Sequence, residues 1–311
     1  MGSETVVVGG DLLRRGHGDA EVNALRWGAS EGAEDLPVLV CLHGLGGSHA
    51  NWVLLGGLLA AQGEVWAPDL AGFGLTEPHG RSASVEDNID LAAGFIQAVG
   101  GGRPVLLLGH SMGGHISYSL AAELPELVLG LVLINPAVPP LAGLPDRAVA
   151  RRFLTLATPL VGEAYLARQK RTTTPAEEVQ RSLDIVLAKP SALDPVAFRA
   201  HVEVARQRRR MTHSHSSTLL ASRTLARRIG TGQRALWQAV QRVQAPGLIL
   251  HGGADRLIQT AACDRLAARR PDWDYRVYDD LGHMVILEDP GRVAADIADW
   301  RSQLVPGAQR V

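Results

Sequence analysis

The sequence has few cysteines, few aromatic residues and almost no net charge. Only Cys41 and Cys263 occur among 311 residues, and aromatic residues make up 5%. Two cysteines so far apart favour reduced thiols over a disulfide framework and form no zinc motif. The 31 lysines and arginines are balanced by 32 aspartates and glutamates, which leaves a net charge of −1. A nucleic-acid-binding protein is therefore not expected, because that class usually carries a strongly basic chain or face.

Long apolar runs are also absent. The densest run, residues 127–134, is far shorter than the roughly 20 residues that cross a bilayer, and the N-terminal residues lack the pattern of a signal peptide. We therefore expect a cytoplasmic protein without a membrane span. A content of 46% hydrophobic and 20% charged residues predicts a sizeable buried core in one large or two small domains. The sequence does not indicate an oligomeric state.

Short apolar runs alternate with stretches of helical period between residues 38 and 135. The runs begin near residues 37, 64, 103 and 128, and two more begin at residues 247 and 274. Nearly continuous apolar runs of this length are typical of strands that are buried on both faces. The predicted fold class is therefore α/β, with a mostly parallel sheet covered by helices. The intervening stretches predict helices at 49–62, 85–99, 258–270 and about 284–304.

The alternation stops after Asn135. Residues 137–243 contain no convincing strand, and prolines divide them into several helical segments. An irregular loop of this length inside one domain would be improbable. We therefore predict a core domain of residues 1–136 and 244–311, with residues 137–243 inserted as a helical cap.

The segment Gly109-His110-Ser111-Met112-Gly113-Gly114 follows one predicted strand and precedes a helical stretch. This is the G-x-S-x-G motif in the strand, turn and helix context that presents a nucleophilic serine. The glycines allow a sharp turn, and the helix N-terminus favours developing negative charge. Ser111 is the candidate nucleophile.

A serine hydroxyl needs a base and a carboxylate that orients the base. His283 follows the last predicted strand, and Asp255 follows the strand before it. The chain order Ser111, Asp255, His283 is the one expected for this motif. We predict these three residues as the catalytic triad.

With these motifs the sequence resembles the α/β-hydrolase family, in the branch of capped serine hydrolases related to esterases and lipases. Further signatures are the segments that begin at His43 and Asp69, together with Glu288-Asp289-Pro290. The resemblance covers about residues 20–136 and 244–304 and implies a sheet of about eight strands. It also implies an oxyanion hole made by the backbone N–H groups of Leu45 and Met112. Neither a cofactor nor a metal is expected.

Three residues near these motifs are candidates for substrate binding: His43, Trp52 and His110. For His43 and His110 we favour a role in orienting or packing neighbouring groups over that of a second base. For Trp52, as for Phe73, packing in the core is at least as well supported as lining the acyl pocket.

Several other residues compete for a role in the site. Asn135 stands where some members of the family carry their acid, but an amide cannot supply a carboxylate. Asp279 and Asp280 precede His283 in the same loop, which is a poor position for bonding its ring. His213 and His215 suggest a metal site, yet no third ligand is evident, and a solvated loop is favoured.

A serine at position 111 argues against haloalkane dehalogenases and epoxide hydrolases, which need a carboxylate nucleophile. We expect the reaction to be hydrolysis of carboxylic esters, with small acyl compounds as substrates. Lactone, thioester and carbon–carbon bond hydrolysis stay open, because the same triad can perform them. A cofactor-free haloperoxidase or perhydrolase and a ligand receptor that retains the triad are further alternatives.

The charges are unevenly distributed along the chain. Residues 137–243 hold 18 basic and 7 acidic residues, a net charge of +11, and the remainder carries −12. A solvated arginine-rich face that docks on an acidic body explains this asymmetry. The alternative is that arginines of the cap attract an anionic substrate. The candidates lie in two groups: Arg206, Arg208, Arg209 and Arg210, or Arg168, Lys170 and Arg171.

Overall fold

The computed structural model describes residues 1–9, 18–33, 35–140, 151 and 154–304. Eight strands form one open sheet in the order β1-β2-β4-β3-β5-β6-β7-β8. Their bounds are Gly2–Val8 (β1), Ala20–Trp27 (β2), Leu39–Leu42 (β3), Val65–Pro68 (β4), Val105–His110 (β5), Val128–Ile134 (β6), Gly247–Gly252 (β7) and Asp274–Tyr278 (β8). The predicted α/β fold with an eight-stranded sheet is confirmed.

The directions of the strands agree with how deeply each strand is buried. β3 to β8 run parallel, whereas β1 and β2 are antiparallel to their neighbours. Every residue of β3, β4, β5 and β7 is buried, as expected for strands that helices cover on both sides. β1 lies at the edge and alternates between exposed and half-buried residues. The sheet is therefore mostly parallel, with an antiparallel edge.

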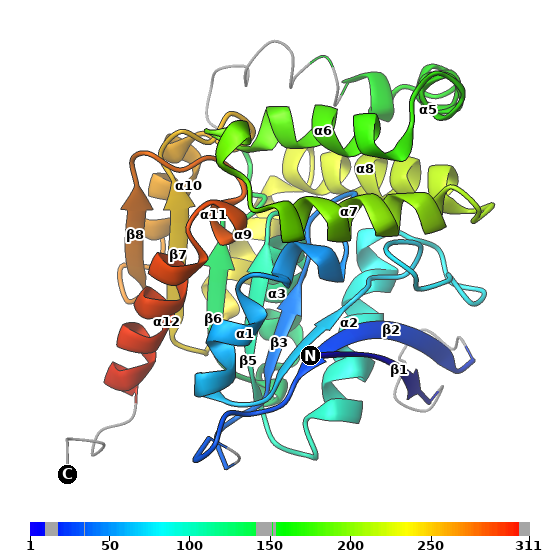
Figure 1. The fold of residues 1–311 in the computed structure, drawn as a ribbon. Coiled ribbons are helices and arrows are strands. Elements are labelled where there is room, and N and C mark those ends of the chain that lie inside the picture. Colours follow the sequence, from blue (N-terminus) through cyan, green and yellow to red (C-terminus); the bar gives the residue numbers. More distant parts are fainter. Residues whose placement is uncertain (10–17, 34, 141–150, 152–153, 305–311) are drawn as a thin grey trace.

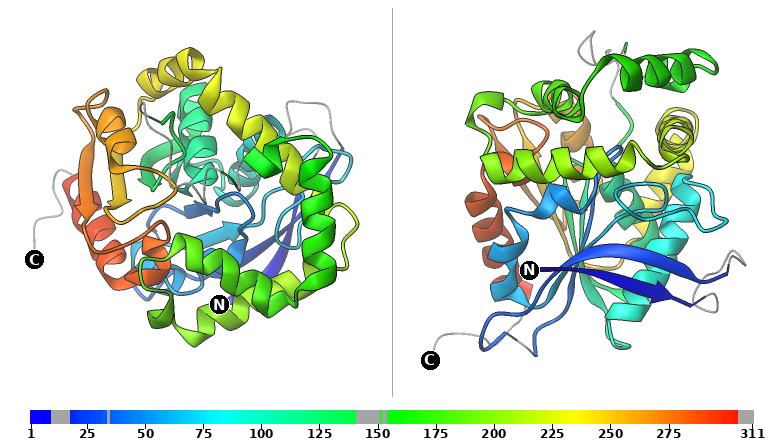
Figure 2. Two further views of the ribbon diagram at one scale, coloured as in Figure 1. Left: turned by 90° about the horizontal axis from the view of Figure 1, so that it is seen from above. Right: turned by 45° about the vertical axis from the view of Figure 1, so that its right-hand side comes forward.

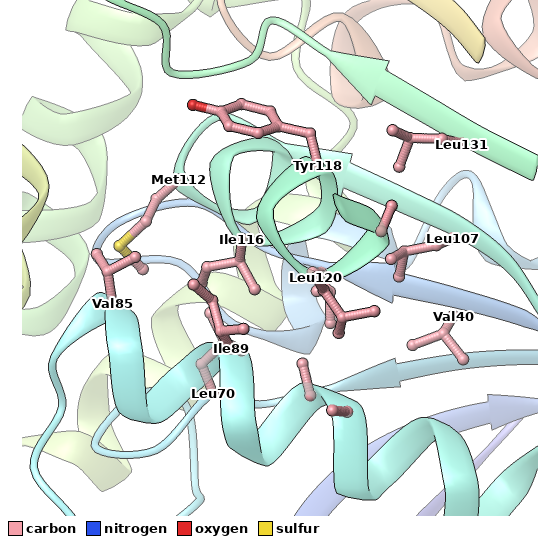
Figure 3. Packing of buried hydrophobic residues seen from close by; sticks show 14 of the residues in the cluster. Val40, Leu70, Val85, Ile89, Leu107, Met112, Ile116, Tyr118, Leu120 and Leu131 are labelled. Atoms are coloured by element: carbon pink, nitrogen blue, oxygen red, sulfur yellow. The ribbon is translucent and has the colours of Figure 1, made fainter. Parts of the chain in front are cut away.

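Two apolar clusters cover the two faces of the sheet. One contains side chains of α2 (Val85–Val99), α3 (Met112–Glu123), α9 (Gln233–Arg242) and α10 (Thr260–Ala267). Figure 3 shows Val85 and Ile89 of α2 packed against Met112 and Ile116 of α3. The other contains side chains of α1 (Gly56–Leu59), α11 (Val285–Glu288) and α12 (Pro290–Leu304).

The helix predicted at 49–62 is interrupted. A 3₁₀ turn, His49–Trp52, precedes α1, and a second one, Ala60–Gln62, follows it. Gly56 lies so close to Trp27 that a Cβ atom would be 2.7 Å from the indole ring. Packing against the sheet therefore determines the path of this segment more than helical periodicity does.

Helices fill the described part of the insertion between β6 and β7. They are α5 (Val161–Thr172), α6 (Pro175–Val186), α7 (Pro195–Arg208), α8 (Ser214–Gly230) and α9. α5 to α8 lie above the carboxyl ends of the parallel strands (Figures 1 and 2). α9, which the predicted division assigns to the cap, packs against α3 beside the sheet. Among the described residues, no helix combines the length and apolar character needed to cross a membrane.

Arg228 of α8 connects the insertion to the core through a buried histidine. Its Nε donates to His115 Nε2 over 2.7 Å, Nη1 to Glu86 over 3.3 Å and Nη2 to Ser119 over 3.2 Å. Burial lowers the pKa of His115 to about 3, so that its ring is neutral and accepts this bond. The remaining ring nitrogen, Nδ1, lies 2.5 Å from the hydroxyl of Tyr118.

We expect Arg228→Gln to lower the free energy of unfolding by about 1–3 kcal/mol, because it removes the donor of the buried His115 Nε2. Arg227→Gln is the matched control, since Arg227 pairs with the same Glu86 from an exposed position. It should change stability by less than about 0.5 kcal/mol. Urea unfolding followed by circular dichroism measures both values, and equal losses in the two variants would contradict the role of Arg228.

Candidate active site

Ser111 lies in a strained turn between β5 and α3. Its φ of 55° is in a region that residues with a side chain rarely adopt. A Cβ atom on Gly109 would be 2.4 Å from Ser117 Oγ, and one on Gly113 would be 2.2 Å from the Leu42 carbonyl oxygen. Only glycine therefore allows β5, α3 and β3 to approach so closely. The turn lifts Ser111 above the carboxyl end of the sheet.

The loop after β3 lies against this turn. A Cβ atom on Gly44 would be 2.9 Å from Ser111 Cβ, and Gly47 N–H donates to the Gly44 carbonyl over 3.0 Å. Leu45 follows Gly44 in this tight turn. Met112 is the first residue of α3, where a backbone N–H has no acceptor within the helix. The two predicted oxyanion-hole residues thus lie in two turns that meet at Ser111.

His283 and Asp255 come together from the loops after β8 and β7. His283 Nδ1 donates to Asp255 Oδ2 over 2.7 Å, and both side chains are buried. A carboxylate only accepts hydrogen bonds, so Nδ1 carries a proton, and in the neutral ring Nε2 then keeps the lone pair. The His283 backbone is also fixed, because its N–H donates to the Val186 carbonyl of α6 and its carbonyl accepts from His110 Nε2.

Asp255 is held in its ionised form by four donors. Oδ1 accepts from the backbone N–H groups of Leu257 and Ile258, and Oδ2 accepts from His283 and from Asn135 Nδ2 over 2.8 Å. Burial opposes ionisation, but the charge and hydrogen bond of His283 and the backbone donors outweigh it. The pKa of Asp255 therefore lies below its ordinary value. Sequence reasoning missed that Asn135 supports this carboxylate.

Ser111, His283 and His110 line one cavity of about 330 Å³ beneath the inserted helices. Its floor includes the loop of Gly44 and Leu45. Side chains of α5 to α8 form the opposite wall, among them Leu183, Val204, Arg208 and Thr218. The cavity thus combines apolar walls with a few polar groups, as is typical of small-molecule sites.

Two residues predicted as substrate-binding candidates are not among those that line this cavity. Trp52 is fully buried in the apolar cluster that contains α1. His43 is fully buried beneath the loop after β3, where Nδ1 donates to the Gly44 carbonyl over 2.8 Å and Nε2 accepts from Leu70 N–H over 3.0 Å. Burial lowers its pKa to about 4. His43 thus fixes the loop that carries Leu45, and of the three candidates only His110 reaches the cavity.

The competing carboxylates lie outside the site, whereas His215 is among the residues that line the cavity. Asp279 and Asp280 are exposed, and Asp280 faces Lys189 and Arg292 at 3.7 and 3.5 Å. His213 lies 3.9 Å from Glu77. Within the described part of the chain, no group of three His, Cys, Asp or Glu side chains could hold a metal ion.

Glu288 joins the histidine loop to the insertion. Its two carboxylate oxygens accept from Gly282 N–H over 2.7 Å and from Ala188 N–H over 2.8 Å. The sequence contains this residue in the Glu288-Asp289-Pro290 signature, but no motif indicates that it bridges to the end of α6. The position of His283 therefore depends on the inserted helices as well as on the sheet.

An open, mostly parallel sheet with a strained serine turn between a central strand and the following helix is typical of the α/β-hydrolase class of proteins. The sequence model of the "Alpha/beta hydrolase family" matches residues 39–296. The chain belongs to this family.

Two curated relatives and one solved structure illustrate the range of this family. The pimeloyl-[acyl-carrier protein] methyl ester esterase of Aromatoleum aromaticum is 30% identical over 277 residues, which are 85% of this chain and 97% of that protein. The dihydrolipoyllysine-residue acetyltransferase component of the acetoin cleaving system of Pseudomonas putida is 28% identical over 85% of this chain, but the match spans only 63% of that protein. The crystal structure of a haloalkane dehalogenase from Bradyrhizobium elkani has a TM-score of 0.74 and 23% identity, covering 92% of this chain and 95% of that one. The last likeness is one of fold alone.

Three of the buried histidines make stability dependent on pH. The pKa of His43 is lowered to about 4 and those of His110 and His115 to about 3, chiefly by burial, whereas an unfolded histidine has a pKa of about 6.5. The unfolded chain therefore binds more protons below that pH. The contribution of these histidines to the free energy of unfolding is fully present above about pH 6.5. It decreases as the pH falls toward 4, by about 1.4 kcal/mol per pH unit for each histidine.

Urea unfolding between pH 7.5 and 4.5 measures this slope. His115→Gln should reduce the slope by about one proton, whereas His79→Asn at an exposed position should not. An unchanged slope in His115→Gln would show that His115 takes up no proton on unfolding.

Proposed function

We propose that the chain is a serine hydrolase of carboxylic esters, with Ser111 as nucleophile, His283 as general base and Asp255 as the group that orients it. The observation that carries this proposal is the 2.7 Å hydrogen bond from His283 Nδ1 to Asp255, in a cavity that Ser111 and His283 both line. The esterase activity in the name of the Aromatoleum aromaticum relative supports the same class of reaction.

The reaction begins when Ser111 Oγ attacks the ester carbonyl and its proton passes to His283 Nε2. The backbone N–H groups of Leu45 and Met112 stabilise the oxyanion of the tetrahedral intermediate. The C–O bond to the alcohol then breaks, and the alcohol leaves with the proton from His283. Asp255 stabilises the imidazolium between these two steps.

Water completes the cycle. His283 Nε2 takes a proton from water as its oxygen attacks the acyl-enzyme carbonyl. The second tetrahedral intermediate releases the carboxylic acid, and the proton returns to Ser111 Oγ. Lactones and thioesters would follow the same steps, with only the leaving group changed.

We further propose that the inserted helices act as a cap on this site. α6 and α7 supply part of the cavity wall, and α6 ends at Val186, whose carbonyl accepts from His283 N–H. A cap in this position excludes water from the reacting groups and shapes the acyl pocket. The acyl length that the site accepts would then be determined by the cap side chains.

Ser111→Ala should reduce kcat/KM on p-nitrophenyl acyl esters by at least about 10³-fold and abolish labelling by a fluorophosphonate, because the nucleophile is lost. Ser216→Ala, at an exposed position of α8, is the matched control and should keep full activity. Multiple turnovers by the wild type would also separate an enzyme from a receptor. Full turnover in Ser111→Ala would rule out the proposed nucleophile.

Asp255→Asn should reduce kcat by about 10³–10⁴-fold, because an amide whose single oxygen accepts from the backbone donors turns its NH₂ group toward His283 and cannot hold the imidazole with its proton on Nδ1. Asp280→Asn tests the competing carboxylate and should have no effect. Steady-state kinetics on one ester decides between them. If Asp280→Asn proves to be the damaging change, the assignment of the acid is wrong.

A further inference from the structure

The cavity contains a half-buried arginine whose guanidinium the proposed reaction does not use. Arg208 is the last residue of α7, and its Cζ lies 5.3 Å from the centre of the Phe73 ring. Its Nη1 is buried and has no hydrogen-bond partner among the residues that the structure describes. The same side chain lines the cavity together with Ser111 and His283.

The carboxylates that act on Arg208 are already bound by other donors. Glu178 Oε2 accepts from Arg209 Nε and Nη2 over 3.2 and 2.9 Å. Arg209 is further fixed by the carbonyl and hydroxyl of Thr173. Within the described part of the chain, no carboxylate forms an ion pair with Arg208. The positive charge of Arg208 thus remains without a direct counterion.

Asp69 is likewise occupied. Its two oxygens accept from the backbone and ring of His49, from Asn23 Nδ2 and from Leu75 N–H. The negative charge of Asp69 favours the charged form of Arg208 only at a distance. This carboxylate therefore does not saturate the donors of the guanidinium.

An unpaired buried cation is costly. Burial lowers the pKa of Arg208, but a guanidinium stays protonated in proteins, so the charge persists. A buried donor without an acceptor destabilises the folded chain. Groups held in this unfavourable state are frequently part of a ligand site, where the ligand supplies the missing partner.

The other arginines of the insertion do not have this environment. Arg206, two residues earlier on α7, is exposed and pairs with Glu203 over 2.9 Å. Arg168, Arg171 and Arg210 are exposed and are not among the residues that line the cavity. Lys170 lines the cavity, but it is exposed. Arg208 is therefore the cation of the two candidate groups that is best placed to meet a substrate inside the cavity.

We propose that Arg208 binds a carboxylate of the substrate, and that the preferred substrates are esters that carry a carboxylate besides the ester to be cleaved. The inference rests on the proposed ester hydrolysis at Ser111. A planar guanidinium can bind a carboxylate through two parallel hydrogen bonds, which fixes the substrate in one orientation. The apolar walls formed by Leu183 and Val204 would contact the carbon chain of such a substrate.

The test compares anionic esters with neutral esters of the same size. For a carboxylate in the acyl part, p-nitrophenyl hydrogen adipate is compared with p-nitrophenyl hexanoate. For a carboxylate in the leaving group, 4-acetoxybenzoate is compared with phenyl acetate. We expect the wild type to prefer the anionic member of at least one pair in kcat/KM, and Arg208→Gln to reduce that preference by about 10- to 100-fold.

Arg206→Gln is the matched control, because it removes an exposed arginine from the same helix. It should leave the preference and the activity on neutral esters unchanged. Arg208→Lys keeps the charge and should retain part of the preference. Titration of Ser111 with a fluorophosphonate counts the folded active sites in each variant, so that the comparison is independent of expression and folding.

A measurement without any variant of Arg208 supplements the test. Adipate should inhibit the wild type at least about 10-fold more strongly than the neutral adipamide. Equal preference in the wild type and Arg208→Gln for both ester pairs, or equal inhibition by the two compounds, would overturn the inference. The proposed ester hydrolysis would still stand, because its failure appears instead as unimpaired turnover in Ser111→Ala.

Discussion

The carboxylate of Asp255 joins the ends of three neighbouring strands, and the geometry of the site depends on it. Asn135 follows β6, Asp255 follows β7 and His283 follows β8, and the side chains of Asn135 and His283 donate to the same Oδ2 atom. Parallel strands bring their carboxyl ends to one edge of the sheet, so residues far apart in the chain meet there. The backbone donors of Leu257 and Ile258 hold the other oxygen. A carboxylate fixed on both oxygens leaves the imidazole one orientation.

The inserted helices take part in this arrangement. Val186 at the end of α6 accepts from the backbone of His283, and Glu288 bridges Gly282 and Ala188. At the other side of the sheet, Arg228 of α8 bonds to His115 of α3, the helix that begins directly after Ser111. The Ser111 turn and the histidine loop are thus each connected to the insertion. A displacement of these helices would act on Ser111, on His283 and on the shape of the cavity.

The sequence predicts those features that follow from local pattern. Buried strands give short, nearly continuous apolar runs, and the glycines around Ser111 are required by contacts with Ser117 and the Leu42 carbonyl, so the sequence locates the buried strands and the turn. The sequence does not locate β1 and β2 individually, because exposed or half-buried residues interrupt both strands, so that neither gives a continuous apolar run. His43 and Trp52 lie beside the predicted loop in sequence, but neither periodicity nor motif tells which neighbours face a cavity and which face the core. The partner of Arg228 and the role of Asn135 depend on contacts over more than 100 residues, which a single sequence does not encode locally.

The basic residues of the insertion make two kinds of contact, exposed ion pairs with the acidic core and buried contacts. Arg227 and Arg228 pair with Glu86, and Lys189 faces Asp280, so part of the basic insertion does meet the acidic body. Pairs such as Arg227–Glu86 and Lys189–Asp280 are largely exposed and contribute little to stability. The attachment of the insertion to the core therefore depends more on buried contacts. Examples are the packing of Leu225 in the core cluster and the hydrogen bond from Arg228 to His115. Exposed charges can be exchanged at little cost, whereas the buried Nη1 of Arg208 has no hydrogen-bond partner among the described residues, which destabilises the folded chain. The arginines of the insertion are thus not equivalent, because Arg208 lines the cavity with a buried Nη1, whereas Arg206 and Arg227 are exposed.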